Sequence, residues 1–140
     1  MSHPILDISS LSRAIHSLSR ALHVLNAEKV TANDDMNQVL TAGVIQNFEF
    51  CYELCWKFMK RWIEMNISPI AVDGVTRREL FRQAAENKLI NDVDKWMDFH
   101  TDRNRTSHIY DEEVAEEVLA TTIEALPYFQ DLLRNLEARQ

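Results

Sequence analysis

The chain has few residues of the kinds that make tight turns, disulfide frameworks or membrane spans. Its 140 residues include two glycines, three prolines and two cysteines. So few glycines and prolines argue against an all-β domain, which needs many turns. No apolar run approaches the roughly 18 residues needed to cross a membrane, and the N-terminus lacks the basic and apolar regions of a signal peptide. We therefore expect a cytoplasmic protein with reduced thiols.

Positive charge is also scarce. The chain has 15 lysines and arginines against 22 aspartates and glutamates, and its formal net charge is −7. This balance argues against a broad, sequence-independent grip on nucleic acid, although a small local phosphate site remains compatible with it. A hydrophobic content of 46% excludes wholesale disorder. Alanine, leucine, glutamate and arginine are plentiful, so we expect one all-α domain over residues 1–140.

Apolar residues at three-to-four spacing predict five helices. The first should begin after Asp7, Ser9 or Ser10 and end before Asn33. The other four are expected at residues 36–65, 76–85, from 91 or 92 to about 103, and 111–136, and Pro127 should kink or restart the last one. Four long helices and one short helix predict an up-and-down four-helix bundle with an additional short helix.

The predicted second helix is apolar on more than one side. One stripe consists of Val44, Phe48, Cys51, Cys55, Phe58 and Trp62. Further apolar residues lie elsewhere around it, at Phe50, Leu54, Trp56 and Ile63. Such a helix is either central in a bundle or part of a subunit interface. We therefore expect a homodimer.

The two cysteines lie one helical turn apart, at Cys51 and Cys55. They could contribute to a metal site, but the chain has no second cysteine pair and its histidines are scattered. Two small buried thiols in an apolar stripe are the favoured interpretation.

Two polar sets each allow a structural and a functional interpretation. The first set is a column at four-residue spacing that consists of Glu49, Glu53, Lys57 and Arg61. This spacing is typical of an exposed ion-pair row, although Glu53 and Lys57 could face a site in a dimer. Four basic residues could contact RNA or could equally be a solvated helix face; these are Arg77, Arg78, Arg82 and Lys88.

Helix packing does not explain the segment DRNRTSHIYDEE, which contains Arg103, His108 and Tyr110. An arginine offers a planar fork of donors for two phosphate oxygens, and a histidine can act as a general acid or base near neutral pH. Cleavage of RNA through its 2′-hydroxyl needs a base, an acid and positive charge, and it needs no metal. One chain supplies one such histidine, so a two-fold dimer would be required to supply both roles. From residue content alone, a helix cap and a surface histidine are the commoner explanation. His100 is close enough to touch this segment, or it packs beside Trp96.

The same segment resembles the HEPN ribonuclease signature, and the added tyrosine resembles the subgroup called HepT. The cassette FEFCYELCWK, at residues 48–57, is similar to the branch named nucleotidyltransferase substrate-binding proteins. The resemblance extends roughly from Asp35 to Glu117. The arginine-to-histidine spacing alone is unspecific, but the two cassettes together are not.

This resemblance implies a HEPN ribonuclease toxin of a toxin-antitoxin pair. Its partner would be a minimal nucleotidyltransferase, the MNT antitoxin, encoded nearby. A dimer would cleave RNA without a metal, with Arg103 and His108 as the catalytic pair and Asn104 at a position that is often polar in the family. Tyr110 matches the tyrosine that the partner modifies with AMP, which would silence the toxin.

We add Arg105, Glu53 and Lys57 as candidate substrate-binding residues, and we expect neither a metal nor another cofactor. The resemblance also implies an alternative function. In the substrate-binding branch, the same helical bundle is regarded as the non-catalytic, substrate-binding subunit of a two-component nucleotidyltransferase.

Overall fold

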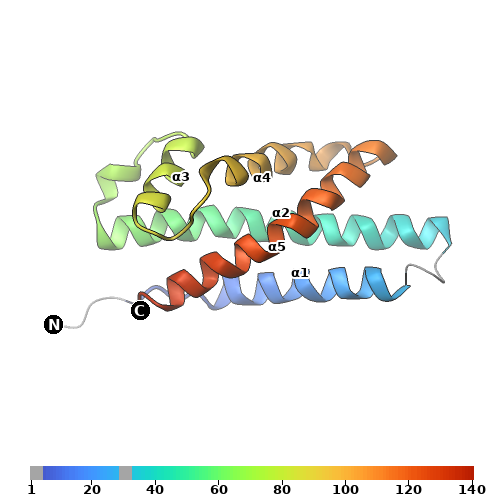
Figure 1. Ribbon diagram of the computed structural model, residues 1–140, viewed down its shortest axis with the longest axis horizontal. Coiled ribbons are helices and arrows are strands. Elements are labelled where there is room, and N and C mark those ends of the chain that lie inside the picture. Colours follow the sequence, from blue (N-terminus) through green and yellow to red (C-terminus); the bar gives the residue numbers. More distant parts are fainter. Residues whose placement is uncertain (1–4, 29–32) are drawn as a thin grey trace.

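The computed structural model describes residues 5–28 and 33–140, which form five α-helices and two short 3-10 helices. In chain order these are α1 (Ser9–Glu28), α2 (Asp34–Asn66), η1 (Pro69–Val72), α3 (Arg77–Glu86), α4 (Val93–Arg105), η2 (Thr106–His108) and α5 (Glu112–Glu137). Helices α1 and α2 run antiparallel side by side, α3 and α4 lie along the other side of α2, and α5 crosses the bundle on its way back (Figure 1). The predicted all-α bundle with an additional short helix is confirmed. Within the two described ranges, no helix is long and apolar enough to cross a membrane.

Side-chain caps define where the helices begin. Thr76 accepts a hydrogen bond from the backbone N–H of Glu79 at 3.1 Å, and Asp92 accepts one from Lys95 at 3.0 Å. Asp111 caps α5 in the same way, with the backbone N–H of Glu113 2.9 Å from its carboxylate. These short polar residues satisfy N–H groups that have no partner within the helix. The helix starts predicted at residues 76, 92 and 111 are therefore confirmed.

Two local details differ from the prediction. Helix α5 runs through Pro127 as one helix, so it does not restart there, and a kink at Pro127 stays a prediction. The carbonyl that loses its partner belongs to Ile123, whose side chain is 55% exposed, so this side of the helix is open to water. The fourth helix was expected to end at about residue 103, but α4 continues through Asn104 and Arg105, and η2 follows directly. The Thr106 hydroxyl donates to the carbonyl of Arg103 at 2.8 Å, which closes the helix end.

An aromatic cluster fills the centre of the bundle. The ring of Phe129 stacks on Phe48 with centroids 6.0 Å apart and lies 5.5 Å from Trp96. Cys51 and Cys55 are fully buried beside this cluster, and burial raises the pKa of Cys51 to about 12. The interpretation of the cysteines as buried thiols is confirmed. This rigid core holds the middle of α2 against α4, where the candidate site lies.

Candidate functional site

Arg103 lies near the end of α4 and is held across the bundle by α2. Its Nε donates to Oε1 of Glu53 at 3.1 Å, and Nη1 donates to the Thr106 hydroxyl at 3.3 Å. A second acid, Glu49, approaches Nη1 at 4.0 Å. The Arg103 side chain remains 31% exposed. The guanidinium is thus oriented from one side and open to a ligand on the other.

Both oxygens of Glu53 have a partner, because Oε2 accepts from the indole Nε1 of Trp56 at 3.1 Å. The carboxylate is therefore fixed in its plane, and it fixes the plane of the Arg103 guanidinium.

The predicted ion-pair row along α2 is wrong. Its acids pair across helices, and its bases Lys57 and Arg61 pair with no carboxylate in the described ranges. Lys57 instead lies 5.7 Å from the centre of the Trp56 ring.

His108 and Tyr110 form an exposed pair at η2 and the residues that follow it. The Tyr110 hydroxyl lies 3.5 Å from Nδ1 of His108, and the two rings meet edge to face with centroids 5.9 Å apart. The Tyr110 side chain is 83% exposed. Both a macromolecular substrate and a modifying enzyme could therefore reach this pair.

The turn between α4 and α5 is anchored by Asp102, a buried acid that sequence reasoning missed. Its carboxylate accepts from Nη1 of Arg105 at 3.2 Å and from the hydroxyl of Thr121 on α5. Arg105 also pairs with Glu117 on α5. These contacts tie both ends of the turn together and hold η2 between them. An acid three residues after the buried Phe99, on the same helix face, was the available sequence signal.

The predicted substrate-binding role of Arg105 stays a prediction, although its guanidinium already engages two carboxylates. Asn104 lies exposed on α4, and its side chain makes no hydrogen bond within the described part of the chain. The structure thus brings Glu53 to Arg103 and Tyr110 to His108.

A second polar pair lies behind Arg103. The Tyr52 hydroxyl lies 2.7 Å from Nδ1 of His100, so Tyr52 holds the His100 ring. Burial, followed by the charge of Arg77, lowers the pKa of His100. Burial also raises the pKa of Tyr52. Both groups are therefore neutral at neutral pH, and sequence analysis did not identify the pair.

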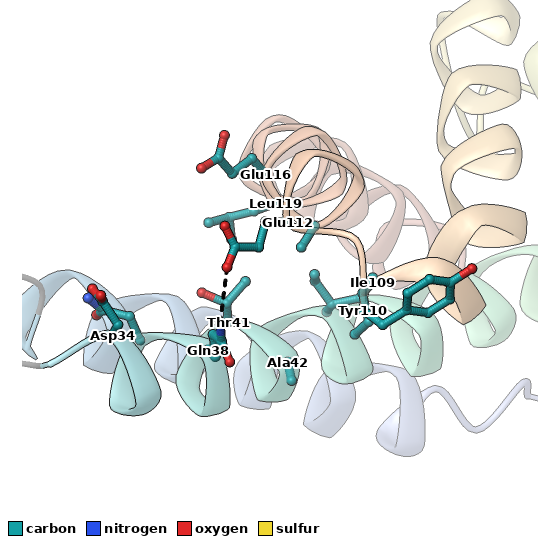
Figure 2. Close-up of a pocket in the computed structure, with 12 residues that line it drawn as sticks. Asp34, Gln38, Thr41, Ala42, Ile109, Tyr110, Glu112, Glu116 and Leu119 are labelled. Carbon is teal, nitrogen blue, oxygen red and sulfur yellow. Dashed lines mark hydrogen bonds between the residues drawn. The ribbon is translucent and has the colours of Figure 1, made fainter.

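A groove of about 610 Å³ opens beyond Tyr110, between the first half of α2 and the start of α5. The Gln38 amide donates a hydrogen bond to the Glu112 carboxylate across this groove, at an N···O distance of 3.3 Å. In Figure 2, the Tyr110 ring points away from this hydrogen bond. Three carboxylates line the groove, those of Asp34, Glu112 and Glu116. Such a lining repels phosphate groups.

Comparison with known proteins identifies relatives along nearly the whole chain. The family model described as "Nucleotidyltransferase substrate binding protein like" matches residues 6–138. A Haemophilus influenzae protein named "Probable ribonuclease HepT" is 38% identical over 107 residues, which are 74% of this chain and 72% of the relative.

Solved structures agree with this assignment. A Haemophilus influenzae protein, HI0074, described as having the fold of a substrate binding domain of a nucleotidyltransferase, superposes with a TM-score of 0.89 at 32% identity, covering 96% of this chain and 100% of that one. A Thermus thermophilus protein, at a TM-score of 0.63 and 22% identity over 85% of this chain and 98% of its own, shares the fold. Together with the family model, these matches confirm the predicted resemblance, and the chain belongs to the family of nucleotidyltransferase substrate binding protein like proteins.

Proposed function

We propose that this protein is a metal-independent endoribonuclease toxin that acts as a homodimer and is silenced when a partner nucleotidyltransferase attaches AMP to Tyr110. The observation that carries the proposal is the geometry of Arg103, which Glu53 orients at 3.1 Å while part of its guanidinium stays open. His108 follows on the next turn and is exposed. The similarity to a probable ribonuclease supports the same function.

The chemistry needs a phosphodiester at Arg103. The ribose 2′-oxygen attacks the adjacent phosphorus and loses its proton to a base, while the 5′-oxygen leaves with a proton from an acid. The guanidinium stabilises the charge that builds on the phosphate oxygens. The imidazole of His108 takes one of the two proton-transfer roles, and the same residue of the second subunit takes the other.

Exposed apolar side chains support the dimer. On α2, Val39 is 72% exposed and Phe50 is 56% exposed. Eleven positions are about three helical turns, so the two side chains lie on one face of α2, and apolar side chains that share an exposed face are typical of surfaces that a partner covers. Association through α2 would place two copies of the Arg103–Glu53 pair in one assembly.

The position of Tyr110 supports its role in control. Its hydroxyl lies 3.5 Å from His108, so AMP on that oxygen would put a phosphodiester beside the imidazole. The added charge and bulk would compete with RNA for the site. A phenol that is 83% exposed is also accessible to a modifying enzyme.

The decisive experiment incubates the purified full-length dimer with labelled RNA in the presence of a chelator. Cleavage by the wild-type protein that disappears in His108→Ala, and in protein carrying AMP on Tyr110, is the expected result. No cleavage by unmodified wild-type protein would refute the proposal. Coexpression with the nucleotidyltransferase encoded nearby, followed by intact mass measurement, tests the modification, and Tyr110→Phe should gain no mass.

A second candidate function is favoured by the matching family description, which concerns substrate binding for a nucleotidyltransferase. In that case, the bundle is a non-catalytic subunit that docks a nucleotidyltransferase and presents its substrate. His108→Ala would then leave growth of the host cell unchanged, while a stable complex with the nucleotidyltransferase persists. Toxicity that depends on His108 would exclude this alternative.

A further inference from the structure

Arg77, the first residue of α3, lies flat against an aromatic ring beside the candidate site. The centre of its guanidinium is 3.5 Å from the centre of the Trp56 ring, a close cation–π stack. Its Nε is buried and has no hydrogen-bond partner within residues 5–28 and 33–140. Burial lowers the pKa of Arg77, which reflects partial loss of hydration. The two terminal nitrogens make no hydrogen bond within the described residues and are not buried, so they can bind an anionic ligand, whereas the buried Nε cannot.

The neighbouring arginines of α3 are different, because each already has a carboxylate. Arg78 pairs with Asp94 at 3.3 Å, and Arg82 binds Glu79 at 2.8 Å and also pairs with Glu86. These two arginines are exposed and neutralised, as the solvated-face interpretation of this basic set predicted. Among the three arginines of this set, Arg77 is the one without a carboxylate partner within the described residues.

A continuous chain of contacts connects Arg77 to Arg103. Arg103 donates a hydrogen bond to Glu53, and the indole of Trp56 donates another to the same carboxylate. The Trp56 ring in turn stacks against the Arg77 guanidinium. Glu53 and Trp56 are three positions apart on α2, about 4.5 Å along the helix axis, so Arg103 and Arg77 are held by neighbouring positions of the same helix. Both guanidiniums act electrostatically on the Tyr52 hydroxyl and on the His100 ring, so the two cations lie near the same pair of side chains.

The surface charge along α2 changes from acidic to basic on the two sides of Glu53. The acidic groove lies over residues 34–45, on the N-terminal side of Glu53. Lys57 and Arg61 lie exposed on the C-terminal side, and neither pairs with a carboxylate in the described part of the chain. A polyanion at Arg103 is therefore repelled on one side and attracted on the other.

We infer that Arg77, presented by Trp56, binds the RNA phosphate next to the one at Arg103, and that the strand continues over Lys57 and Arg61. This inference rests on the proposed ribonuclease function. It explains how a protein with a net charge of −7 can hold RNA, since a short basic strip suffices where a broad basic face is missing.

The test measures binding of a fluorescent single-stranded RNA to the full-length dimer by anisotropy, from about 50 to about 200 mM salt. All proteins carry His108→Ala so that the RNA stays intact. Arg77→Met keeps an apolar side chain on Trp56 and removes the charge, Arg77→Lys keeps the charge, and Arg82→Met is the matched control on the same helix. Thermal unfolding of each variant verifies that the bundle stays folded.

Arg77→Met is expected to weaken binding roughly five- to twentyfold and to lower the salt slope by about 0.7, the value for one phosphate of a single strand. Arg77→Lys should retain the slope, and Arg82→Met should bind within about twofold of its parent because its charge is already paired. Equal affinity and equal slope for Arg77→Met and Arg82→Met would overturn the inference. If the wild-type protein still cleaves RNA in that case, the ribonuclease proposal survives. Binding that depends on Arg77 without any cleavage supports the inference and refutes the catalysis.

Discussion

Glu53→Gln tests whether the carboxylate that holds Arg103 positions it for catalysis. The two oxygens of Glu53 accept from Arg103 Nε and from Trp56 Nε1, each at 3.1 Å. Glutamine has the same shape but only one accepting oxygen, so it can satisfy only one of these two donors. A hydrogen bond to a charged group contributes about 1.5–3 kcal/mol. Since both side chains are about a third exposed, we take about 1–2 kcal/mol for the loss.

A loss of that size at the reacting phosphate lowers kcat about five- to thirtyfold. The assay measures cleavage of labelled RNA in chelator and determines kcat and KM separately. KM should stay level or fall, because one negative charge beside the phosphate site has been removed. The matched control is Glu49→Gln, whose carboxylate lies 4.0 Å from Arg103 and makes no hydrogen bond to it. We expect this control to change kcat less than about twofold.

Equal kcat values for Glu53→Gln and Glu49→Gln would refute the positioning role. So would an unchanged kcat together with a lower KM, because Glu53 would then act only as a counter-charge to Arg103. A large drop in the melting temperature of Glu53→Gln would assign the contact to folding. The measured kcat must therefore be accompanied by a melting curve that matches the wild type.

Three further perturbations follow from the structure. Asp102→Ala removes a buried acceptor of Arg105 and of Thr121, so the free energy of unfolding, measured by urea titration, should fall by about 1–3 kcal/mol; an unchanged midpoint would contradict the anchoring role. Phe129→Ala empties the centre of the aromatic cluster, and the same titration should show a loss of about 3–5 kcal/mol. The pKa of His100 is lowered from 6.5, chiefly by burial. As the pH falls, the imidazole of His100 is therefore protonated at a higher pH in the unfolded chain than in the folded chain. Wild-type stability should therefore fall more steeply than that of His100→Gln below about pH 6.5, and parallel pH profiles would refute this reasoning.

Helix periodicity and capping chemistry predicted most of the fold because both are local. The stripe of Phe48, Cys51 and Cys55 became the buried face of α2, and Thr76 and Asp92 cap helices where short polar residues were expected. Helix α5 does not restart at Pro127, because the proline lies on an exposed side of the helix, where water can satisfy the carbonyl that loses its partner. The connection after Arg103 was also misjudged, because the Thr106 hydroxyl closes α4 from within its own turn.

Pairing between helices was not readable from the sequence. Glu53 and Lys57 stand four residues apart, which is the spacing of an ion pair on one helix. In the folded chain, Glu53 instead accepts a hydrogen bond from Arg103, fifty residues away. This contact is partly buried, and a partly buried charge-assisted hydrogen bond is stronger than an exposed ion pair. His100 and Tyr52, on different helices, form a hydrogen bond because polar groups that are removed from water need a partner.

The sequence by itself determined the helical class, most helix boundaries and the segment that carries Arg103, His108 and Tyr110, because spacing and capping act within a few residues. Only the tertiary structure decided which side chains meet. It oriented Arg103 through Glu53, and it stacked Arg77 on Trp56 with no salt bridge to a carboxylate in the described part of the chain. These contacts join helices that are distant in sequence, and their strength depends on burial and charge that exist only once the bundle has closed.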